Sequence, residues 1–525
     1  MTPTEEASET AVRQRNGIRT KEQAVPQQNV DASSPNSNLS EWNRHMEGVK
    51  AEVVEEISAQ LKILLDKAMK EAEQSYKNED KTAKTTPQQG SQSPVFERKK
   101  VFVHRASLLD DLMEEEHFRS LYHMFVAVLC IFVISTAAVD IIEHGRFVLK
   151  FDLLFYTFGQ LDTVAWCWIC MFTYTLLIPY KTLHFWGSLY PKTKHKFLLN
   201  AFTSIFLLVC QTCVLFIFPV SVVRIYRVPP ASSFVVILES FRLFMKSYAI
   251  FRESVPAVLH AEKKEILLPK LSSYLYFLFC PTLIYRDSYP RTPKIRWNYV
   301  IKYFAQFLAC LFLNYYVMVH LCVPVFTNMS KQPFTIRTLV LSIFHATLPG
   351  ALLLLSSFFG FLHSWMNAFA EMLRFADRMF YKDWWNSTSF SNYYRTWNVI
   401  IHDWLYYYMY QDLLWLLKGR FRAGVLLAVF LLSASVHEYA FTLSFGFFYP
   451  VMFCLFAILG VCFNFVINDK RTSPVYNVIV WTFLFLGQGI QVCLYCQEWY
   501  AQIHCPLKEK TFWGLVTPRS WSCHL

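Results

Sequence analysis

The fold is decided by stretches such as GVLLAVFLLSASVHEYAFTLSFG at Gly424–Gly446. A transmembrane helix needs about 20 consecutive, mainly apolar residues, and this stretch supplies them almost without interruption. A helix on the surface of a soluble protein would instead carry a charged face along its whole length. The stretch therefore predicts a helix that crosses a lipid bilayer.

Stretches of the same kind recur from Leu121 onward. We expect nine membrane-spanning helices, near residues 120–141, 154–178, 197–219, 234–252, 299–326, 338–369, 424–446, 448–467 and 475–498. The apolar run from 424 to 467 is too long for one crossing and is divided at Tyr449–Pro450, because proline ends a helix. Hydrophobic residues make up 54% of the chain and charged residues 17%, which is too little charge to cover a soluble protein. The sequence predicts an all-α polytopic membrane protein.

The loops between these stretches are basic on one side of the membrane. Lysine and arginine gather in 179–196, 253–298, 370–423 and the short turn Asp469–Arg471. Since cytosolic loops carry the excess of positive charge, the N-terminus is expected in the cytosol and, after nine crossings, the C-terminus in the lumen. The count can differ by one or two, because the 234–252 stretch contains Glu239, Arg242 and Lys246. The net charge of +11 is spread over the tail and these loops, which disfavours a nucleic-acid partner.

Residues 1–98 are expected to form a cytosolic, largely disordered tail, and residues 99–525 the membrane domain. Within the tail, a helix near 41–76 is predicted by an apolar stripe at helical spacing from Trp42 to Ala68. Such a stripe suits self-association, as a dimer or tetramer, or packing against the chain's own surface. The start of the chain shows no charged-then-apolar signal segment, so an internal helix is expected to direct insertion.

His437 is the most informative single residue, because an ionisable group inside a spanning helix is costly and marks a functional site. Ser433 lies four residues earlier on the same helical face and can line the same cavity. The alternative is a neutral histidine whose hydrogen bonds are satisfied by a neighbouring helix.

The segment 370–423 is too aromatic for a solvated linker and too polar to cross the membrane. It contains FYKDWWN at 380–386, TWN at 396–398 and HDWLYYY at 402–408. We expect it to lie at the membrane interface or in a protein-lined cavity. An amphipathic anchor without a catalytic role is the alternative.

These strings, together with SASVHEY at 433–439, resemble the membrane-bound O-acyltransferase superfamily. The combination of HDWLYYY at 402–408 with RDSYPR at 286–291 favours its acyl-coenzyme A:cholesterol acyltransferase branch, and within it the second isoform. The resemblance runs from about residue 100 to the C-terminus. The FYxDWWN pattern alone also fits the related diacylglycerol acyltransferases.

The resemblance implies a role for individual residues. His437 would be the catalytic histidine and Asn398 its partner. The channel for acyl-CoA would be lined by Asn392, Arg395, Asn398, His402, Tyr410, Arg422 and Ser433. The motif itself comprises Phe380, Tyr381, Asp383, Trp384, Trp385 and Asn386. His117, just before the first crossing, would belong to a second sterol site. The resemblance places the protein in the membrane of the endoplasmic reticulum.

The residue chemistry agrees with acyl transfer. A neutral imidazole can remove the proton of a sterol hydroxyl as the thioester is attacked, and an amide such as Asn398 can donate to the thioester carbonyl. Acyl-CoA is a substrate, no cofactor is expected, and the fourteen scattered cysteines show no CxxC…CxxC metal pattern. Cys505 and Cys523 lie in the short tail expected in the oxidising lumen, where a disulfide persists; the resemblance implies the same pair.

Other functions remain open. The acceptor can be diacylglycerol or another lipid alcohol. A sterol-binding receptor or transporter is a further alternative, in which His437 would bind a ligand or relay protons. A transporter should show repeats and charged pairs on several helices, whereas the unusual polarity here is concentrated in 380–440. A serine hydrolase is disfavoured, because no GxSxG motif occurs.

Overall fold

The computed structural model of the chain describes residues 46, 99–145, 151–259, 268–329, 335–466, 473–507 and 511–523. The chain divides into two units, Met1–Ser93 and Pro94–Leu525, and the description below concerns the second. The helix expected near 41–76 lies outside the described residues, apart from Met46.

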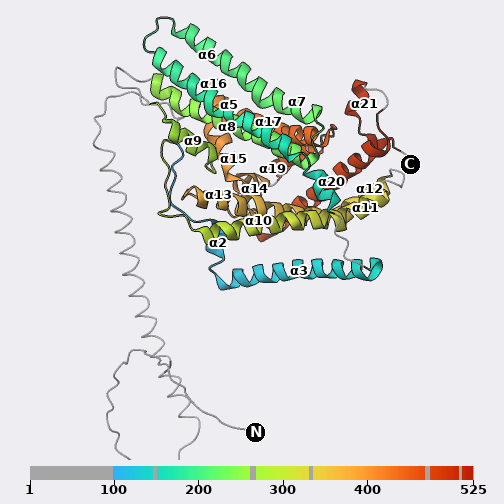
Figure 1. The fold of residues 1–525 in the computed structure, drawn as a ribbon. Helices are drawn as coiled ribbons and strands as arrows, with labels where there is room; N and C mark the ends of the chain where they lie inside the picture. Colours follow the sequence, from blue (N-terminus) through green and yellow to red (C-terminus); the bar gives the residue numbers. More distant parts are fainter. Residues whose placement is uncertain are drawn as a thin grey trace, which may run out of the picture. The chain divides into compact units, whose positions relative to one another are not determined.

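The described residues form helices and no β-strand (Figure 1). The α-helices are α2 (Leu108–Leu112), α3 (Glu116–His144), α4 (Asp152–Thr157), α5 (Leu161–Leu189), α6 (Lys196–Gln211), α7 (Phe218–Ile225), α8 (Pro230–Leu259), α9 (Leu271–Phe279), α10 (Trp297–Val317), α11 (Val323–Met329), α12 (Ile336–Ser357), α13 (Met366–Met372), α14 (Phe390–Trp397), α15 (Val399–Trp404), α16 (Gln411–Leu416), α17 (Arg422–Phe445), α18 (Val451–Phe453), α19 (Gly460–Val466), α20 (Pro474–His504) and α21 (Phe512–Val516). Wider π-helical turns are η1 (Thr212–Ile217), η2 (Met318–Cys322), η3 (Phe358–Trp365), η5 (Leu405–Tyr410) and η6 (Cys454–Leu459), and 3₁₀ turns are η4 (Trp384–Asn386) and η7 (Arg519–Trp521).

Seven helices of the described residues are long and apolar enough to cross a membrane. They are Glu116–Glu143, Asp152–Leu189, Lys196–Ile225, Trp297–Thr327, Ile336–Met372, Arg422–Phe445 and Pro474–His504. Each coincides with a stretch predicted from the sequence. The other two predicted crossings are also helical: α8 carries several charges, and the apolar helix Val451–Phe463 is shorter. The fold is therefore that of an all-α multi-pass membrane protein.

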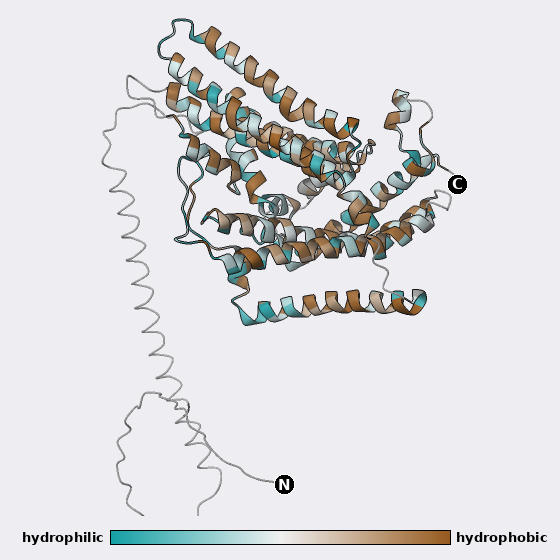
Figure 2. Ribbon diagram, viewed as in Figure 1, coloured by the Kyte–Doolittle hydropathy of each residue, from teal (hydrophilic) through white to brown (hydrophobic). Residues whose placement is uncertain are grey.

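Apolar side chains point outward along these helices, as contact with lipid requires. None of the residues in the most apolar window of α3 is buried, and Leu121, Val128 and Ile131 are exposed. Figure 2 shows brown, hydrophobic colour along α3, α6 and α10. Because a soluble protein rarely exposes such continuous apolar surface, this surface faces the bilayer.

The charges of α8 are paired inside the protein. Glu239 binds Arg242 at 2.6 Å and accepts a hydrogen bond from the Trp168 indole at 2.9 Å. Lys246 is buried and donates to the backbone carbonyls of Phe277 at 2.5 Å and Cys280 at 2.7 Å. These carbonyls lie at the end of α9, where the helix leaves acceptors unpaired. The charges thus hold α9 against α8.

The segment 370–423 is a chain of short helices rather than a loop. In Figure 1, α14 and α15 lie in the middle of the view, between α10 below and α8 and α17 above. Phe390 and Tyr393 of α14 and Trp404 of α15 belong to the largest hydrophobic core. The segment is therefore built into the protein, which favours the protein-lined interpretation over a surface anchor.

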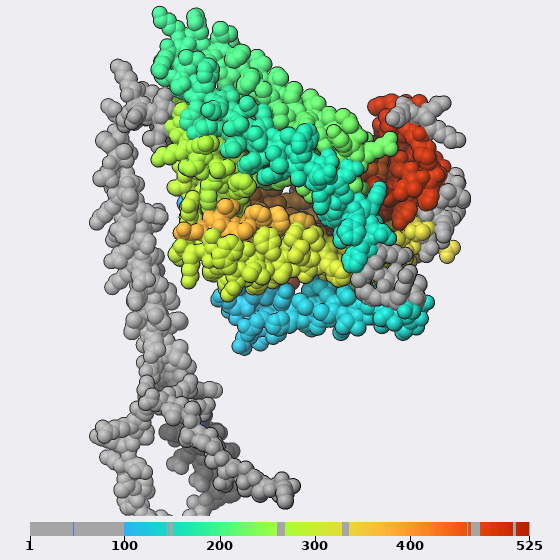
Figure 3. Space-filling view, in the orientation of Figure 1, coloured from blue at the N-terminus to red at the C-terminus, as the bar shows by residue number. Residues whose placement is uncertain are grey.

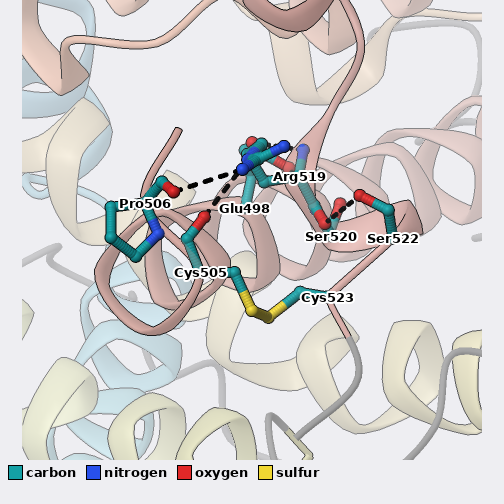
Figure 4. Close-up of a disulfide and its surroundings, with 7 residues drawn as sticks. All are labelled: Glu498, Cys505, Pro506, Arg519, Ser520, Ser522 and Cys523. Carbon is teal, nitrogen blue, oxygen red and sulfur yellow. Dashed lines mark hydrogen bonds between the residues drawn. A yellow bond between two sulfur atoms is a disulfide. The ribbon is translucent and has the colours of Figure 1, made fainter. Parts of the chain in front are cut away.

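The tail after α20 folds back onto that helix (Figure 4). A disulfide joins Cys505 to Cys523, the pair that the sequence predicts. The buried Glu498 carboxylate accepts hydrogen bonds from the backbone nitrogens of Arg519 and Ser520, both at 2.9 Å. Arg519 in turn donates to the carbonyl of Cys505 at 3.1 Å. A covalent bond and a buried carboxylate therefore hold the same turn.

Candidate functional site

His437 lies in the interior of α17, which begins at Arg422 and ends before Gly446. Its Nδ1 lies 2.7 Å from the backbone carbonyl oxygen of Ser433, one helical turn earlier. A carbonyl can only accept, so Nδ1 carries the hydrogen of the neutral ring and Nε2 is left with the lone pair. The contact with Ser433 is thus made through its backbone rather than its hydroxyl, and it makes Nε2 the basic atom.

One face of the His437 ring is covered by Phe456 of η6, with ring centroids 5.4 Å apart and planes 22° apart. Phe456 also packs on Phe430 and on Tyr394 of α14, with centroids 4.7 Å apart in both cases. The His437 side chain keeps exposed surface beside this aromatic cluster.

Glu438, next to His437, is buried and anchors the following helix. Its buried carboxylate accepts from the backbone nitrogen of Phe453 at 3.0 Å and from the Tyr495 hydroxyl at 3.1 Å. The same hydroxyl accepts from the backbone nitrogen of Met452 at 3.1 Å. Glu438 therefore holds the start of α18, which runs directly into η6 and Phe456.

Asn398 occupies the junction between α14 and α15. Its side-chain oxygen accepts from the backbone nitrogen of Ile401 at 3.2 Å and so caps α15. The junction is also bound to the FYKDWWN motif, because the backbone nitrogen of Val399 donates to the carbonyl of Phe380 at 2.9 Å. With the oxygen used in capping, the amide nitrogen of Asn398 is the atom that can donate to a substrate.

The FYKDWWN motif supplies packing more than chemistry. Phe380, Tyr381 and Trp384 are buried, whereas Asp383 and Asn386 are exposed. Trp384 packs on Trp397 and Trp481, with ring centroids 4.7 and 5.2 Å apart. From α20, the side chains of Asn477 and Trp481 donate to the carbonyl of Trp385 at 2.8 and 3.0 Å. The motif thus packs the segment that carries Asn398 against α20.

Two of the predicted acyl-CoA residues lie on α14. The backbone nitrogen of Asn392 binds the Ser389 hydroxyl at 3.1 Å, and its side-chain nitrogen donates to the Ser387 hydroxyl at 3.2 Å. Arg395 is exposed. Asn392 therefore also stabilises the loop that leads from the motif into α14.

His402 and Tyr410 belong to a stack of three rings along α15 and η5. His402 lies parallel to Tyr406, with centroids 6.2 Å apart, and Tyr406 lies parallel to Tyr410, with centroids 5.9 Å apart. The Asp403 carboxylate lies 3.6 Å from Nδ1 of His402 and is ion-paired with Lys100. Burial opposes ionisation of Asp403, but His402 and Lys100 outweigh it and hold its pKa below the ordinary value.

The remaining predicted residues lie further away along the chain. Arg422 is exposed in the first turn of α17, on the helix that carries His437. His117 is exposed in the first turn of α3, and Figure 1 shows α10 lying between α3 and α17. His117 is thus not brought to His437. No group of three or more His, Cys, Asp or Glu side chains suited to a metal occurs among the described residues.

The helices that carry the predicted site residues pack against one another. α17, with His437, packs against η5, η6 and α8, and α14 packs against α19. Figure 3 shows a hollow on one face of the protein, between the teal atoms of α5 and the yellow-green atoms of α10, with orange atoms along its edge. His437, Asn398 and the aromatic stack are therefore carried by elements connected through packing, with η5 against α17 and α15 against η5 and α14.

Sequence reasoning missed Phe456, Glu438 and Lys100. Glu438 had a usable signal, because a carboxylate inside an apolar helix is as costly as a histidine. Phe456 had none, since it is one phenylalanine of 48. The pairing of Lys100 with Asp403 joins residues 303 positions apart and leaves no local pattern.

Comparison with known proteins identifies the family. The model of the membrane-bound O-acyltransferase family matches residues 147–497. The chain is 56% identical to human sterol O-acyltransferase 2 over 93% of both chains, and 55% identical to the mouse protein of that name over the same shares. It is 54% identical to sterol O-acyltransferase 1 of Cricetulus griseus over 81% of this chain and 79% of the relative. The chain therefore belongs to the membrane-bound O-acyltransferase family and is an acyltransferase.

Proposed function

We propose that the protein transfers a long-chain fatty acyl group from acyl-CoA to the 3-hydroxyl of cholesterol, giving cholesteryl ester and coenzyme A. The observation that carries this proposal is the 56% identity to a sterol O-acyltransferase over 93% of both chains. An identity this high over almost the whole chain favours the same substrate pocket.

In the proposed reaction, His437 is the general base. Its Nδ1 donates to the carbonyl of Ser433, so Nε2 faces the reaction and takes the proton of the sterol hydroxyl. The oxygen of the sterol then attacks the thioester carbonyl. Phe456, stacked on the ring, holds the imidazole in the orientation that this proton transfer needs.

Asn398 stabilises the charge that develops on the thioester oxygen. Its own oxygen caps α15, which leaves the amide nitrogen as the group that would donate to the thioester oxygen. A donor of this kind contributes about 3–4 kcal/mol of transition-state stabilisation in comparable sites. Coenzyme A leaves as a thiolate, which needs little help from an acid, and the reaction requires no cofactor.

Acyl-CoA binds from the cytosolic side along α14, α15, η5 and the start of α17. The proposed contacts are Asn392, Arg395, Asn398, His402, Tyr410, Arg422 and Ser433. Arg422 and His437 are separated on one helix by about 22 Å at 1.5 Å per residue, a distance that an extended pantetheine arm can bridge. The phosphates of the nucleotide would then meet arginine, whose forked donors suit them.

The setting is a further part of the proposal. Nine crossings place the N-terminus in the cytosol and the C-terminus in the lumen of the endoplasmic reticulum, with α8 and the helix after Pro450 as the two additional spans. The sterol enters from the membrane, and His117 contributes to a second sterol site. The tail helix near 41–76 assembles the protein into a dimer or tetramer.

The test is to give purified protein labelled oleoyl-CoA with cholesterol, with diacylglycerol, or with neither. We expect labelled cholesteryl ester as the main product. Labelled triacylglycerol instead would mean a different lipid alcohol as acceptor. Sterol binding without any ester would mean a receptor or transporter, and either result would overturn the proposal.

A further inference from the structure

Residues 99–107, here called the strap, precede α2 and bind to parts of the chain almost three hundred residues away. The backbone nitrogen of Arg105 donates to the carbonyl of Ala376 at 3.0 Å, and that of Arg378 donates to the carbonyl of Arg105 at 3.2 Å. The Ser107 hydroxyl lies 3.0 Å from the hydroxyl of Tyr381 in the FYKDWWN motif. The strap is thus bound directly to the segment that leads to Asn398.

At its other end, the strap reaches α15. Lys100 forms an ion pair with Asp403, and both side chains are largely buried, with exposed fractions of 13% and 14%. The carbonyl of Lys100 also accepts from Arg286 at 3.2 Å, and Arg286 is paired with Glu253 at 2.6 Å. A buried ion pair with well-placed neighbours holds its partners strongly, because breaking it leaves a buried charge alone.

Asp403 connects this ion pair to the ring stack. One carboxylate oxygen binds Lys100, and the other lies 3.6 Å from Nδ1 of His402. A carboxylate at this place favours the hydrogen on Nδ1 and turns Nε2 of His402 away from it. His402 in turn stacks on Tyr406, which stacks on Tyr410.

The Asp403 carboxylate is ionised, as its contacts with Lys100 and His402 require. In the folded protein, the pKa of the Asp403 carboxyl lies below its ordinary value. The ion pair is therefore complete above the unfolded-state pKa of about 4, and it is lost only as the pH falls through the pKa of the folded state. Over the pH range of an activity assay, the carboxylate is therefore ionised.

From this geometry we infer that Lys100 and Asp403 are positioning residues for acyl-CoA, which hold His402, and through it the stack His402–Tyr406–Tyr410, in the orientation that binds the substrate. The inference rests on the proposed function, in which His402 and Tyr410 contact acyl-CoA. It adds that the strap, although remote in sequence, is part of the support of that site.

The experiment measures binding of a non-hydrolysable oleoyl-CoA thioether by titration calorimetry, with full-length protein, alongside steady-state kinetics. For Asp403→Asn and Lys100→Met we expect the Kd and the KM for acyl-CoA to rise about tenfold, which corresponds to about 1.4 kcal/mol. The kcat at saturating acyl-CoA should stay within about twofold of wild type, because the reacting groups are untouched. Lys100→Arg keeps the charge and should restore most of the affinity.

Two controls separate positioning from a general loosening of the fold. Arg105→Ala removes a strap side chain that pairs with Asp377 at 2.7 Å instead of Asp403, and it should leave the Kd unchanged. In a double-mutant cycle, Asp403→Asn should add little to His402→Ala, since both act on the same contact.

The outcomes distinguish the two proposals. If the wild-type protein does not bind the thioether, the proposed function fails. If the wild type binds it and Asp403→Asn and Lys100→Met bind equally well, the inference about the strap is wrong while the function stands. An equal loss in Arg105→Ala, or full additivity with His402→Ala, would also overturn it.

Discussion

The backbone of its own helix selects which ring nitrogen of His437 carries the hydrogen. The carbonyl of Ser433 accepts from Nδ1, and a ring fixed in this way presents Nε2 without any second acidic residue. Asn398 is arranged by the same principle, since the oxygen of its amide caps α15 and leaves the amide nitrogen as the donor that the proposed function uses. At both residues, local backbone geometry does the orienting that a side-chain partner does in many other enzymes.

Replacing His437 with alanine should abolish ester formation while expression and membrane insertion are retained. Loss of a general base costs roughly two to four orders of magnitude in rate. Product formation from labelled oleoyl-CoA measures the effect, with Ser435→Ala on the same helix as the control. If the alanine variant kept more than a tenth of the wild-type turnover, His437 would not be the base.

Asn398→Ala should lower kcat with little change in affinity for acyl-CoA, but it also removes the cap of α15, which is worth about 1 kcal/mol of stability. Asn398→Asp separates the two effects, because its carboxylate still accepts from Ile401 but cannot donate. We expect Asn398→Asp to melt near the wild-type temperature and to lose roughly a hundredfold or more in kcat. A loss of affinity alone would make Asn398 a binding residue.

At the scale of the elements, the candidate site depends on short helices that anchor one another. Glu438 holds the start of α18, and η6 then places Phe456 on His437. Asn477 and Trp481 of α20 hold the FYKDWWN loop, whose backbone holds the junction at Asn398. His437 and Asn398 are thus each contacted by a short element that another helix holds in place.

Glu438→Ala should destabilise the protein, since it leaves the backbone nitrogen of Phe453 and the hydroxyl of Tyr495 without their acceptor. Each unpaired buried group costs about 1–3 kcal/mol. Thermal unfolding in detergent should show a clear fall in melting temperature, and Tyr495→Phe, which removes only the hydroxyl, should show a smaller one. Equal melting of Glu438→Ala and wild type would mean that this anchor contributes nothing.

At the scale of the whole molecule, the chain combines a membrane domain with a tail of different character. Seven apolar helices of the described residues face lipid, whereas the tail is polar apart from one apolar stripe. The strap, in the membrane unit, binds to Asp403, next to His402. The membrane domain therefore needs the first residues after the tail, and the tail itself is expected to serve assembly.

Deleting residues 1–76 should lower the oligomeric state and leave the membrane domain folded, because the strap is retained. The reason is the apolar stripe from Trp42 to Ala68, which suits self-association. Mass measurement in detergent checks this, with melting temperature as the control for folding. An unchanged mass would favour a helix that packs on its own chain.

Cys505 and Cys523 should be found joined in protein alkylated before lysis and mapped without reduction. A lumenal tail permits this bond, which stabilises it by about 3 kcal/mol on loop-entropy grounds. Free, labelled thiols at both positions would contradict the disulfide. They would also argue against the odd number of crossings that places this tail in the lumen.

The sequence alone determined the membrane class, the position of the apolar helices, the unusual segment 370–423 and the cysteine pair of the tail. These follow from hydropathy, composition and charge, which are properties of neighbouring residues and can be read locally. His437 and Asn398 were proposed as site residues from short strings, since their motifs are local as well, and their roles stay a prediction.

Only the tertiary structure decided how these parts act on one another. It paired the charges of α8 inside the protein, where the sequence had left the count of crossings open. It placed Phe456 on His437, brought Lys100 to Asp403, and showed that Ser433 acts through its carbonyl. Such contacts join residues that are far apart in the chain or depend on one rotamer, and the packing of helices, rather than any local pattern, selects them.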